Sequence, residues 1–418
     1  MKICFVSTFP PSRRGLNEYG YHIAKELQQD PTLSLVILAD RLPTPQPQED
    51  SGEFNVIRCW SFNSLANPWC LLRKIRELDP DVVWFNLGFA SFGNKPLPAF
   101  AGFAIPAMVR ATGHYTHVTL HQLMETVDLK DAGVRFPRLY KIAGFIATRL
   151  LLMSNSISVL LPAYRRTLIE KYRAESIHFR AHGIFSARPE YPDISLRANP
   201  TQRILAFGKW GTYKRLEQMI EAFKIINEKL PNVELVIAGG NHPNMPGYVE
   251  SVAERVRDNP RIRCLGYVPE EQVPELFSKA SVVVMPYTSS AGSSGVAHLA
   301  CQFGVPILSA EVSDFRELAN AEDLAVLFYP IGNVEALSQQ VIELLQDPEL
   351  QREMSERNFS AALRMTMPQI IYQYLRSFHL HRRTKALQPI TRFRRLPSWI
   401  SSRPSLARLV APKGAPWG

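Results

Sequence analysis

Two lysines five residues apart are the clearest candidates for chemistry in this chain. Lys209 and Lys214 lie in the segment FGKWGTYKR, where Lys209 directly follows an apolar run that predicts a strand. Lys214 stands where the next helix is expected to open. Two ammonium groups at the carboxyl edge of a strand can bind the phosphates of a nucleoside diphosphate and stabilise it as a leaving group. Lysines in a solvated loop are the alternative that this pair alone leaves open.

A second candidate is a run of small and hydroxyl residues between a buried strand and an apolar helix. The segment PYTSSAGSSGVAHLACQFGVPIL covers 286–308, and Ser293, Ser294 and Gly295 are expected at the N-terminus of its helix. Free backbone NH groups and serine hydroxyls at that position can bind phosphate oxygens. Close packing or helix capping would explain the same residues.

The first predicted strand leads into a similar turn. STFPP is followed by Ser12, two arginines and Gly15, before a helix that is expected to begin near Asn17. A strand, a turn with glycine and a helix N-terminus together direct backbone NH groups and the positive end of a helix dipole at an anion. Because the GxGxxG pattern is absent, a purely structural turn is an equal alternative.

Histidines are expected at the ends of three strands. His121 ends VTLH, where a histidine can hydrogen-bond a sugar hydroxyl or transfer a proton. His182 in AHG and His242 in AGGNHPN are weaker candidates of the same kind. A structural role is the alternative for all three.

The apolar pattern predicts the scaffold that would bring these residues together. Short β-branched runs alternate with helical patterns, and the strands of the first half are expected at 2–7, 33–40, 81–87, 117–123 and 156–161. Near-continuous apolar strands separated by helices are typical of a parallel sheet covered on both faces.

The same rhythm restarts after a polar, proline-bearing stretch at 187–202. Strands are expected at 203–209, 233–240, 262–267, 281–287, 306–310 and 325–330, with helices at 214–230, 270–279 and 334–345. We therefore expect an α/β protein of two Rossmann-like domains facing across a cleft. The first would cover 1–186, the linker 187–202 and the second 203–365. Such folds bind ligands at the carboxyl ends of their strands.

The net charge of +10 resides in the C-terminal part of the chain. Residues 376–418 hold ten of the 48 Lys and Arg residues and none of the 38 Asp and Glu residues, so 1–375 is neutral. A neutral body argues against nucleic acid as its partner. The basic, proline-rich tail at 381–418 is not expected to form a core of its own. It is a solvated disordered end, a segment attracted to an anionic membrane surface, or a site for nucleic acid or another protein.

Other features of the composition indicate the compartment. The five cysteines are scattered and odd in number, which favours reduced core residues over a disulfide framework or a zinc site. The N-terminus MKICFVST lacks the pattern of a signal peptide. The longest apolar stretches, near 97–109 and 150–161, fall short of the roughly 20 residues that cross a bilayer. We expect a cytoplasmic protein, peripheral on the inner face of the membrane if its tail binds lipid.

Taken together, these segments resemble the family-four retaining glycosyltransferases of the GT-B fold. The resemblance covers Met1 to about Leu380 and rests on landmarks that follow one another in the family's order. They are STFPP with Gly15, DPDVVWFN, VTLH ending in His121, LLPAYRRTLIEKY, AHGI, the pair Lys209 and Lys214, ELVIAGG, LGYVPEEQVPELFSKASVVVMPY, FGVPIL and the helix near SDFREL.

The resemblance implies transfer of a hexose from a nucleoside-diphosphate sugar to a saccharide or lipid-linked acceptor, with retention of configuration and without a metal. Gly15 would approach the donor phosphates and His121 would contact the transferred sugar. Lys209 and Lys214 would bind the diphosphate. The helix at 366–380 would return to the first domain.

One departure from the family pattern concerns acidic residues. The family usually has two glutamates eight residues apart before the GVP turn, but Ala291 and Leu299 stand at those places. The segment with Ser293, Ser294 and Gly295 would then contact the donor through hydroxyls and backbone. Two alternatives follow from this departure and from the shared fold: an inactive glycosyltransferase-like binding subunit and a nucleotide-sugar epimerase.

Milder departures affect the phosphate contacts. Lys209 stands where the family commonly has arginine, so charge is kept while the bidentate fork is lost. Leu16 stands where the family often has a second glycine.

Overall fold

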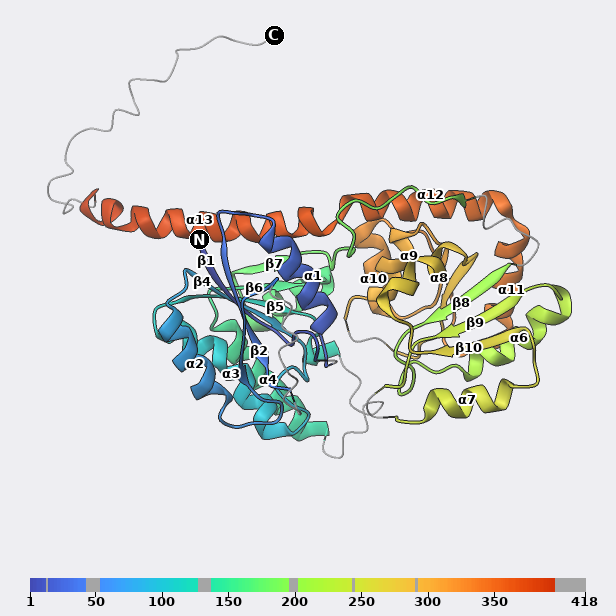
Figure 1. Ribbon diagram of the computed structural model, residues 1–418, viewed down its shortest axis with the longest axis horizontal. Coiled ribbons are helices and arrows are strands. Elements are labelled where there is room, and N and C mark those ends of the chain that lie inside the picture. Colours follow the sequence, from blue (N-terminus) through green and yellow to red (C-terminus); the bar gives the residue numbers. More distant parts are fainter. Residues whose placement is uncertain are drawn as a thin grey trace, which may run out of the picture. The chain divides into compact units, whose positions relative to one another are not determined.

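The computed structural model describes residues 1–12, 14–42, 53–126, 137–194, 202–242, 245–289 and 292–394. The chain has two compact units, Met1–Tyr372 and Gln373–Gly418. The first unit contains two parallel sheets connected by helices (Figure 1), which confirms the prediction of a two-domain α/β protein. No helix in the described ranges is long and apolar enough to span a bilayer.

The first sheet has seven parallel strands in the order β3-β2-β1-β4-β5-β6-β7. The strands are β1 Lys2–Val6, β2 Ser34–Asp40, β3 Val56–Trp60, β4 Val82–Leu87, β5 Tyr115–Leu120, β6 Ser156–Val159 and β7 Ile177–Phe179. The helices are α1 Asn17–Gln28, α2 Asn67–Leu78, α3 Pro96–Ala111, α4 Pro137–Leu152 and α5 Pro162–Tyr172. Helices α2, α3 and α4 pack side by side on one face, and α1 covers the other (Figure 1).

The second sheet has six parallel strands in the order β10-β9-β8-β11-β12-β13. The strands are β8 Arg203–Phe207, β9 Glu234–Ala238, β10 Ile262–Gly266, β11 Val282–Met285, β12 Ile307–Ala310 and β13 Val326–Tyr329. The helices are α6 Glu217–Lys229, α7 Tyr248–Val256, α8 Val273–Ser278, α9 Gly295–Gln302, α10 Ser313–Glu322, α11 Val334–Gln346 and α12 Pro348–Arg364. All six strands predicted for this half are present.

Two strands of the first sheet were not predicted, namely β3 and β7. Both are edge strands with a single neighbour, and several of their residues are only partly buried. An edge strand needs fewer apolar side chains than a central one, so its sequence signal is weak.

One buried tryptophan packs within the first sheet, and another packs just beyond the end of β8 in the second domain. In the first sheet, Trp84 of β4 packs edge-on against Phe5 of β1, with ring centres 5.3 Å apart. Its indole nitrogen donates to the Thr119 hydroxyl at 2.9 Å. In the second domain, the indole of fully buried Trp210, in the loop after β8, donates to the carbonyl oxygen of Ala238 at 2.9 Å. These contacts give the loops at the carboxyl ends a rigid base.

Some predicted element boundaries were wrong. The helix after β8 begins at Glu217 instead of Lys214, because Lys214 pairs in short bridges with Gly211 and Tyr287. The strand expected at 117–123 is Tyr115–Leu120, so His121 lies just beyond its end. The final helix, α13, runs over Met367–Arg394 instead of ending near residue 380. The residues that extend it, such as HRRTKALQ, are mostly good helix formers.

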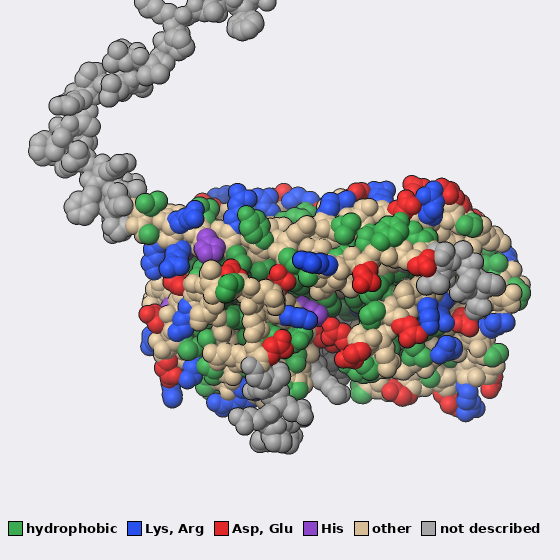
Figure 2. Space-filling view, turned by 45° about the horizontal axis from the view of Figure 1, so that its top comes forward, with side chains coloured by type: hydrophobic (Ala, Val, Ile, Leu, Met, Phe, Trp, Pro, Cys, Tyr) green, Lys and Arg blue, Asp and Glu red, His purple; other side chains and the backbone are tan. Residues whose placement is uncertain are grey.

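Some predicted features lie outside the described residues. These are 195–201 of the linker, 395–418 of the tail, and Ala291. All five cysteines are free, and Cys4, Cys59 and Cys301 are buried. Figure 2 shows acidic and basic side chains interspersed over the face that it presents, which agrees with the equal numbers of each sign in 1–375.

Candidate active site

The loops at the carboxyl ends of four strands carry the residues predicted to do chemistry. Gly15 lies between β1 and α1, and His121 directly follows β5. Lys209 and Lys214 follow β8, and 293–295 follow β11. In each sheet the strand order reverses at the first strand, between β1 and β4 and between β8 and β11. Crevices that bind ligands open at such reversal points.

The β8 loop holds Lys214 against aromatic rings. Its ammonium nitrogen lies 4.5 Å from the ring centre of Tyr287 and 5.9 Å from that of Tyr213. Burial and the nearby charge of Lys209 lower the pKa of Lys214 to about 8. Neither lysine forms an ion pair with a carboxylate of the described residues. A half-buried ammonium group without a carboxylate partner favours binding of an anionic ligand.

A third basic group, His242, lies close to the lysine pair. Burial lowers the pKa of His242, and the charges of Lys214 and Lys209 lower it further. The fields of both lysines therefore reach the loop after β9. We call Lys209, Lys214 and His242 the basic cluster.

Glycines allow the β8 and β9 loops to meet beneath this cluster. Gly239 has a φ of +109°, and a Cβ atom added there would lie 1.8 Å from the carbonyl oxygen of Gly208. Gly208 also packs near the site, since a Cβ on it would lie 3.9 Å from Lys214 Nζ. The close approach of the two loops thus requires a residue without a side chain at Gly239.

The N-terminus of α9 is formed as predicted, but its two serines differ. Ser294 is the N-cap, and its hydroxyl accepts a hydrogen bond from the Ala297 amide at 3.3 Å. The Ser293 hydroxyl is buried and has no hydrogen-bond partner among the described residues. The Ser294 side chain therefore caps α9. The Ser293 hydroxyl lies beside the first-turn amides of α9 and forms no hydrogen bond with the described residues.

His121 is part of a chain of polar side chains that ends at Ser7, the residue after β1. Its Nε2 atom lies 2.6 Å from Asn86 Oδ1, and the Asn86 amide nitrogen donates to the Ser7 hydroxyl at 3.2 Å. Since the amide oxygen can only accept, Nε2 carries the proton and Nδ1 is left as an acceptor. Burial lowers the pKa of His121 to about 3, so the ring is neutral at physiological pH.

Histidines from both domains lie beside one another at His121. The ring of Tyr19 lies 4.8 Å from that of His121 and 4.4 Å from that of His182. The ring of His182 in turn lies 4.8 Å from that of His298 on α9. Burial lowers the pKa of His182 well below its usual range, and His298 and His121 add to this effect. We call His121, His182 and His298 the histidine cluster.

His298 differs from the other two because it has a buried carboxylate partner. Its Nε2 lies 2.9 Å from Glu322 Oε2, and both side chains are almost fully buried. Burial alone would lower the pKa of His298, but the Glu322 carboxylate outweighs burial and raises it. The pair places an imidazole beside a carboxyl group near the N-terminus of α9.

The loop before α9 touches the loop after β5. A Cβ atom added to Gly292, whose φ is +104°, would lie 2.4 Å from the carbonyl oxygen of His121. The histidine cluster is thereby joined to Ser293 and Ser294. A Cβ atom added at Gly15 would have neither lysine within 4 Å, and the one atom within that distance is Thr8 Oγ1 at 3.7 Å. Two groups, the histidine cluster and the basic cluster, therefore form, and Gly15 belongs to neither.

Sequence reasoning missed four residues of this site: Tyr19, Asn86, Tyr287 and His298. Each occurs within an apolar run or a helix where it resembles a core residue, and the pairing of His298 with Glu322 joins residues far apart in sequence. The one available signal was the position of Asn86 and Tyr287 at or beyond the ends of predicted strands. Leu299, at one of the places where a glutamate was expected, is half-buried on α9.

The second half of the chain matches a protein-family model. Residues 187–360 match the model described as glycosyl transferases group 1. This part of the chain, 187–360, is therefore similar to the group 1 glycosyl transferases. It includes both lysines of the basic cluster and the whole of α9.

Two curated relatives are similar to part of the chain. An uncharacterized glycosyltransferase of Methanocaldococcus jannaschii is 29% identical over 145 residues, which are 34% of this chain and 36% of the relative. The O-antigen chain mannosyltransferase B of Escherichia coli is 23% identical over 177 residues, 42% of this chain and 45% of the relative. The chain thus matches less than half the length of these relatives.

Solved structures match the whole arrangement. Sucrose-phosphate synthase from Thermosynechococcus elongatus superposes with a TM-score of 0.71 at 15% identity, covering 93% of this chain and 100% of that one. Anabaena HepE in complex with UDP-glucose gives 0.66 at 16% identity, covering 90% and 100%. The two domains of the first compact unit therefore together have the GT-B fold.

Proposed function

We propose that this protein transfers a hexose from a nucleoside-diphosphate sugar to an acceptor, with retention of configuration. The observation that carries the proposal is the basic cluster at the carboxyl ends of β8 and β9, inside residues 187–360, which match the group 1 glycosyl transferases. Its two lysines form no ion pairs with the described residues, as expected of a diphosphate site that fills with ligand.

In this proposal, Lys209 and Lys214 bind the diphosphate and neutralise the charge that develops as the glycosidic bond breaks. Ser293 and the amides of Gly295 and its neighbours add hydrogen bonds at the N-terminus of α9. Ser294 positions that helix end through its cap. Gly15 approaches the donor phosphates from the β1 loop. The reaction uses no metal ion and no cofactor.

His121 is proposed to contact the transferred sugar. With Nε2 donating to Asn86, its neutral ring offers Nδ1 as an acceptor for a sugar hydroxyl. A neutral ring with so low a pKa suits recognition better than proton donation. The acceptor hydroxyl would attack on the face from which the diphosphate leaves.

For the substrates, the names of similar proteins support hexoses on a nucleoside diphosphate. One solved neighbour carries UDP-glucose and one curated relative is named a mannosyltransferase. We propose a saccharide or lipid-linked acceptor and a place in polysaccharide biosynthesis at the cytoplasmic side of the membrane. The basic tail at 381–418 would assist attachment to an anionic membrane, and nucleic acid is not a proposed partner.

Calorimetry with UDP and GDP, followed by donor hydrolysis without acceptor, tests the proposal. We expect specific binding of one nucleotide and slow hydrolysis of its hexose derivative. Lys214→Ala should lower the turnover rate at least about a hundredfold, because a charged contact with the leaving diphosphate is lost. Lys224→Ala, on the exposed face of α6, is the matched control. Wild-type turnover by the Lys214 variant would remove the lysine pair from the mechanism.

A second candidate is a binding subunit without activity. Leu299 on α9 favours it, because an apolar side chain there cannot contact sugar hydroxyls as a glutamate would. This candidate predicts that neither UDP nor GDP binds specifically, so the same calorimetry separates the two.

A further inference from the structure

One face of α4 is apolar and basic yet exposed. Its residues follow the helical repeat along α4 and just past its end: Arg138, Lys141, Ile142, Phe145, Ile146, Arg149 and Met153. Ile142 is 59% exposed, Ile146 44% and Met153 54%. A surface helix normally turns its apolar stripe inward, so an exposed stripe of this kind marks an interaction surface. We call these seven residues the α4 face.

The charge on the α4 face has a single sign. Residues 137–153 contain no Asp or Glu. The guanidinium of Arg149 lies 5.2 Å from the ring centre of Phe145 and 5.7 Å from that of Tyr172, and it forms no ion pair within the described residues. Exposed Arg352 on α12, by contrast, pairs with both Glu349 and Glu356. The α4 face therefore complements a negatively charged surface.

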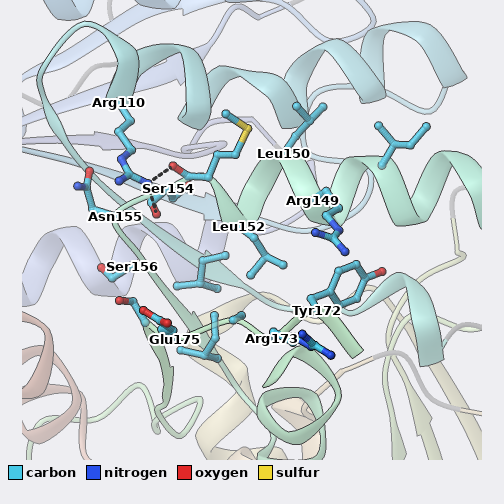
Figure 3. Close-up of a pocket in the computed structure, with 16 residues that line it drawn as sticks. Arg110, Arg149, Leu150, Leu152, Ser154, Asn155, Ser156, Tyr172, Arg173 and Glu175 are labelled. Carbon is cyan, nitrogen blue, oxygen red and sulfur yellow. Dashed lines mark hydrogen bonds between the residues drawn. The ribbon is translucent and has the colours of Figure 1, made fainter. Parts of the chain in front are cut away.

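A cavity of about 540 Å³ adjoins the C-terminal end of this face. Arg110, Arg149 and Arg173 line it together with Leu150 and Met153, and Glu175 contributes a carboxylate (Figure 3). Arg110 is oriented by hydrogen bonds from Nη1 to the carbonyl oxygens of Met153 at 2.7 Å and Ser154 at 3.3 Å. Three guanidinium groups beside apolar side chains fit an anionic headgroup attached to hydrocarbon.

We propose that the α4 face binds an anionic phospholipid bilayer and that the arginine-lined cavity receives a lipid phosphate. The apolar side chains would enter the interface while the basic ones meet the headgroups, as in other interfacial helices. The cavity is lined by the residues that lead into β6 and β7, so it lies at the amino ends of strands. The candidate active site lies at carboxyl ends. Membrane binding is therefore a separate property that does not rest on the proposed transferase activity.

Flotation of the full-length chain with vesicles tests this proposal. Vesicles of phosphatidylcholine alone are compared with vesicles that contain phosphatidylglycerol, at low and high salt. We expect binding to the anionic vesicles that weakens with salt. Lys141→Glu with Arg149→Glu should weaken it at least about tenfold, because two attractive charges become repulsive. Ile142→Ser with Ile146→Ser should weaken it by a similar factor through lost apolar insertion.

Matched controls are Lys224→Glu for charge and Leu363→Ser for apolar exposure, both at exposed positions of the second domain. These variants should bind like the wild type, and circular dichroism should show every variant folded. Amide hydrogen exchange across 138–153 should slow on anionic vesicles, and inorganic phosphate alone should not slow it.

Three outcomes would overturn the proposal. Unchanged flotation of both double variants would assign lipid binding to the basic tail. Protection of 138–153 by free phosphate would mean a small-anion site. A change of oligomeric state in the double variants without any vesicle binding by the wild type would mean a protein contact.

Discussion

At the scale of single residues, the environment of Lys214 lowers its pKa and so affects how it would bind an anionic ligand. It is held against Tyr287 and beside Lys209, and both burial and that neighbour favour loss of its proton, with a pKa of about 8. The ammonium form predominates at neutral pH. A diphosphate would favour this form, so binding and protonation are coupled.

We therefore predict that nucleotide affinity falls as pH rises through the pKa of Lys214. Between pH 7 and 9 the loss should approach about tenfold, because an ammonium group that contacts phosphate becomes neutral. Lys214→Arg should remove this pH dependence, since arginine stays charged. Calorimetry with UDP at three pH values measures the effect, and Lys224→Arg is the control. The same slope in Lys214→Arg and wild type would contradict the prediction.

His121 predicts a pH dependence of stability. Burial lowers its pKa from 6.5 to about 3, so the unfolded chain binds a proton more readily than the folded chain between these values. Its contribution is complete above pH 6.5 and is lost as pH falls towards 3. From pH 6.5 to 5 the loss should be about 2 kcal/mol.

Urea unfolding of wild type and His121→Gln at both pH values isolates this contribution. The free-energy difference between the two proteins should shrink by that amount on acidification. His298, whose pKa is raised, acts with the opposite sign in both proteins and cancels. A constant difference would show that folding leaves the pKa of His121 at its unfolded value.

At the scale of elements, the backbone contact between the β8 and β9 loops builds the floor of the basic cluster. Gly239→Ala would place a Cβ atom 1.8 Å from the carbonyl oxygen of Gly208, at a φ of +109°. We predict a loss of at least about 3 kcal/mol in the free energy of unfolding, since backbone must move against backbone.

The neighbouring glycine is the control for that variant. A Cβ on Gly240 would meet nothing within 4 Å, so Gly240→Ala should change stability by under about 0.5 kcal/mol. Thermal unfolding compares the two variants. Equal effects would show that the loops part easily.

At the scale of the whole molecule, α5 and α10 connect the two sheets of the first compact unit. The Tyr164 hydroxyl donates to Asp314 Oδ2 at 3.0 Å, and Arg166 contacts Glu317 with two hydrogen bonds of 2.8 and 3.1 Å. The first contact is buried and the second is exposed. Burial raises the pKa of Asp314, so this carboxyl group depends on its donors.

Tyr164→Phe should lower the free energy of unfolding by about 1–3 kcal/mol, because the buried Asp314 carboxyl loses a donor. Arg166→Ala should lower the free energy of unfolding by under about 1 kcal/mol, because the Arg166–Glu317 ion pair is exposed to solvent. Urea unfolding measures both. A larger effect of Arg166→Ala would mean that the exposed pair holds the two sheets together.

The sequence by itself determined the two α/β domains, eleven of the strands, the position of Lys209 just after a strand, and that of Ser293 and Ser294 just before a helix. Parallel strands and their covering helices leave a periodic apolar pattern, and small or basic residues directly after a strand stand out against it. These features depend on residues that are close in sequence, so they can be recognised from a single amino-acid sequence.

Only the tertiary structure decided which polar groups meet. Residues from separate elements meet in the histidine cluster and in the pair of His298 with Glu322. The same is true of the contact between the Lys214 ammonium group and the Tyr287 ring. The exposure of α4 is a similar case, because the sequence of an apolar helix is the same whether its apolar face is buried or exposed to solvent. Burial and partnership depend on packing between distant segments, and no local pattern records them.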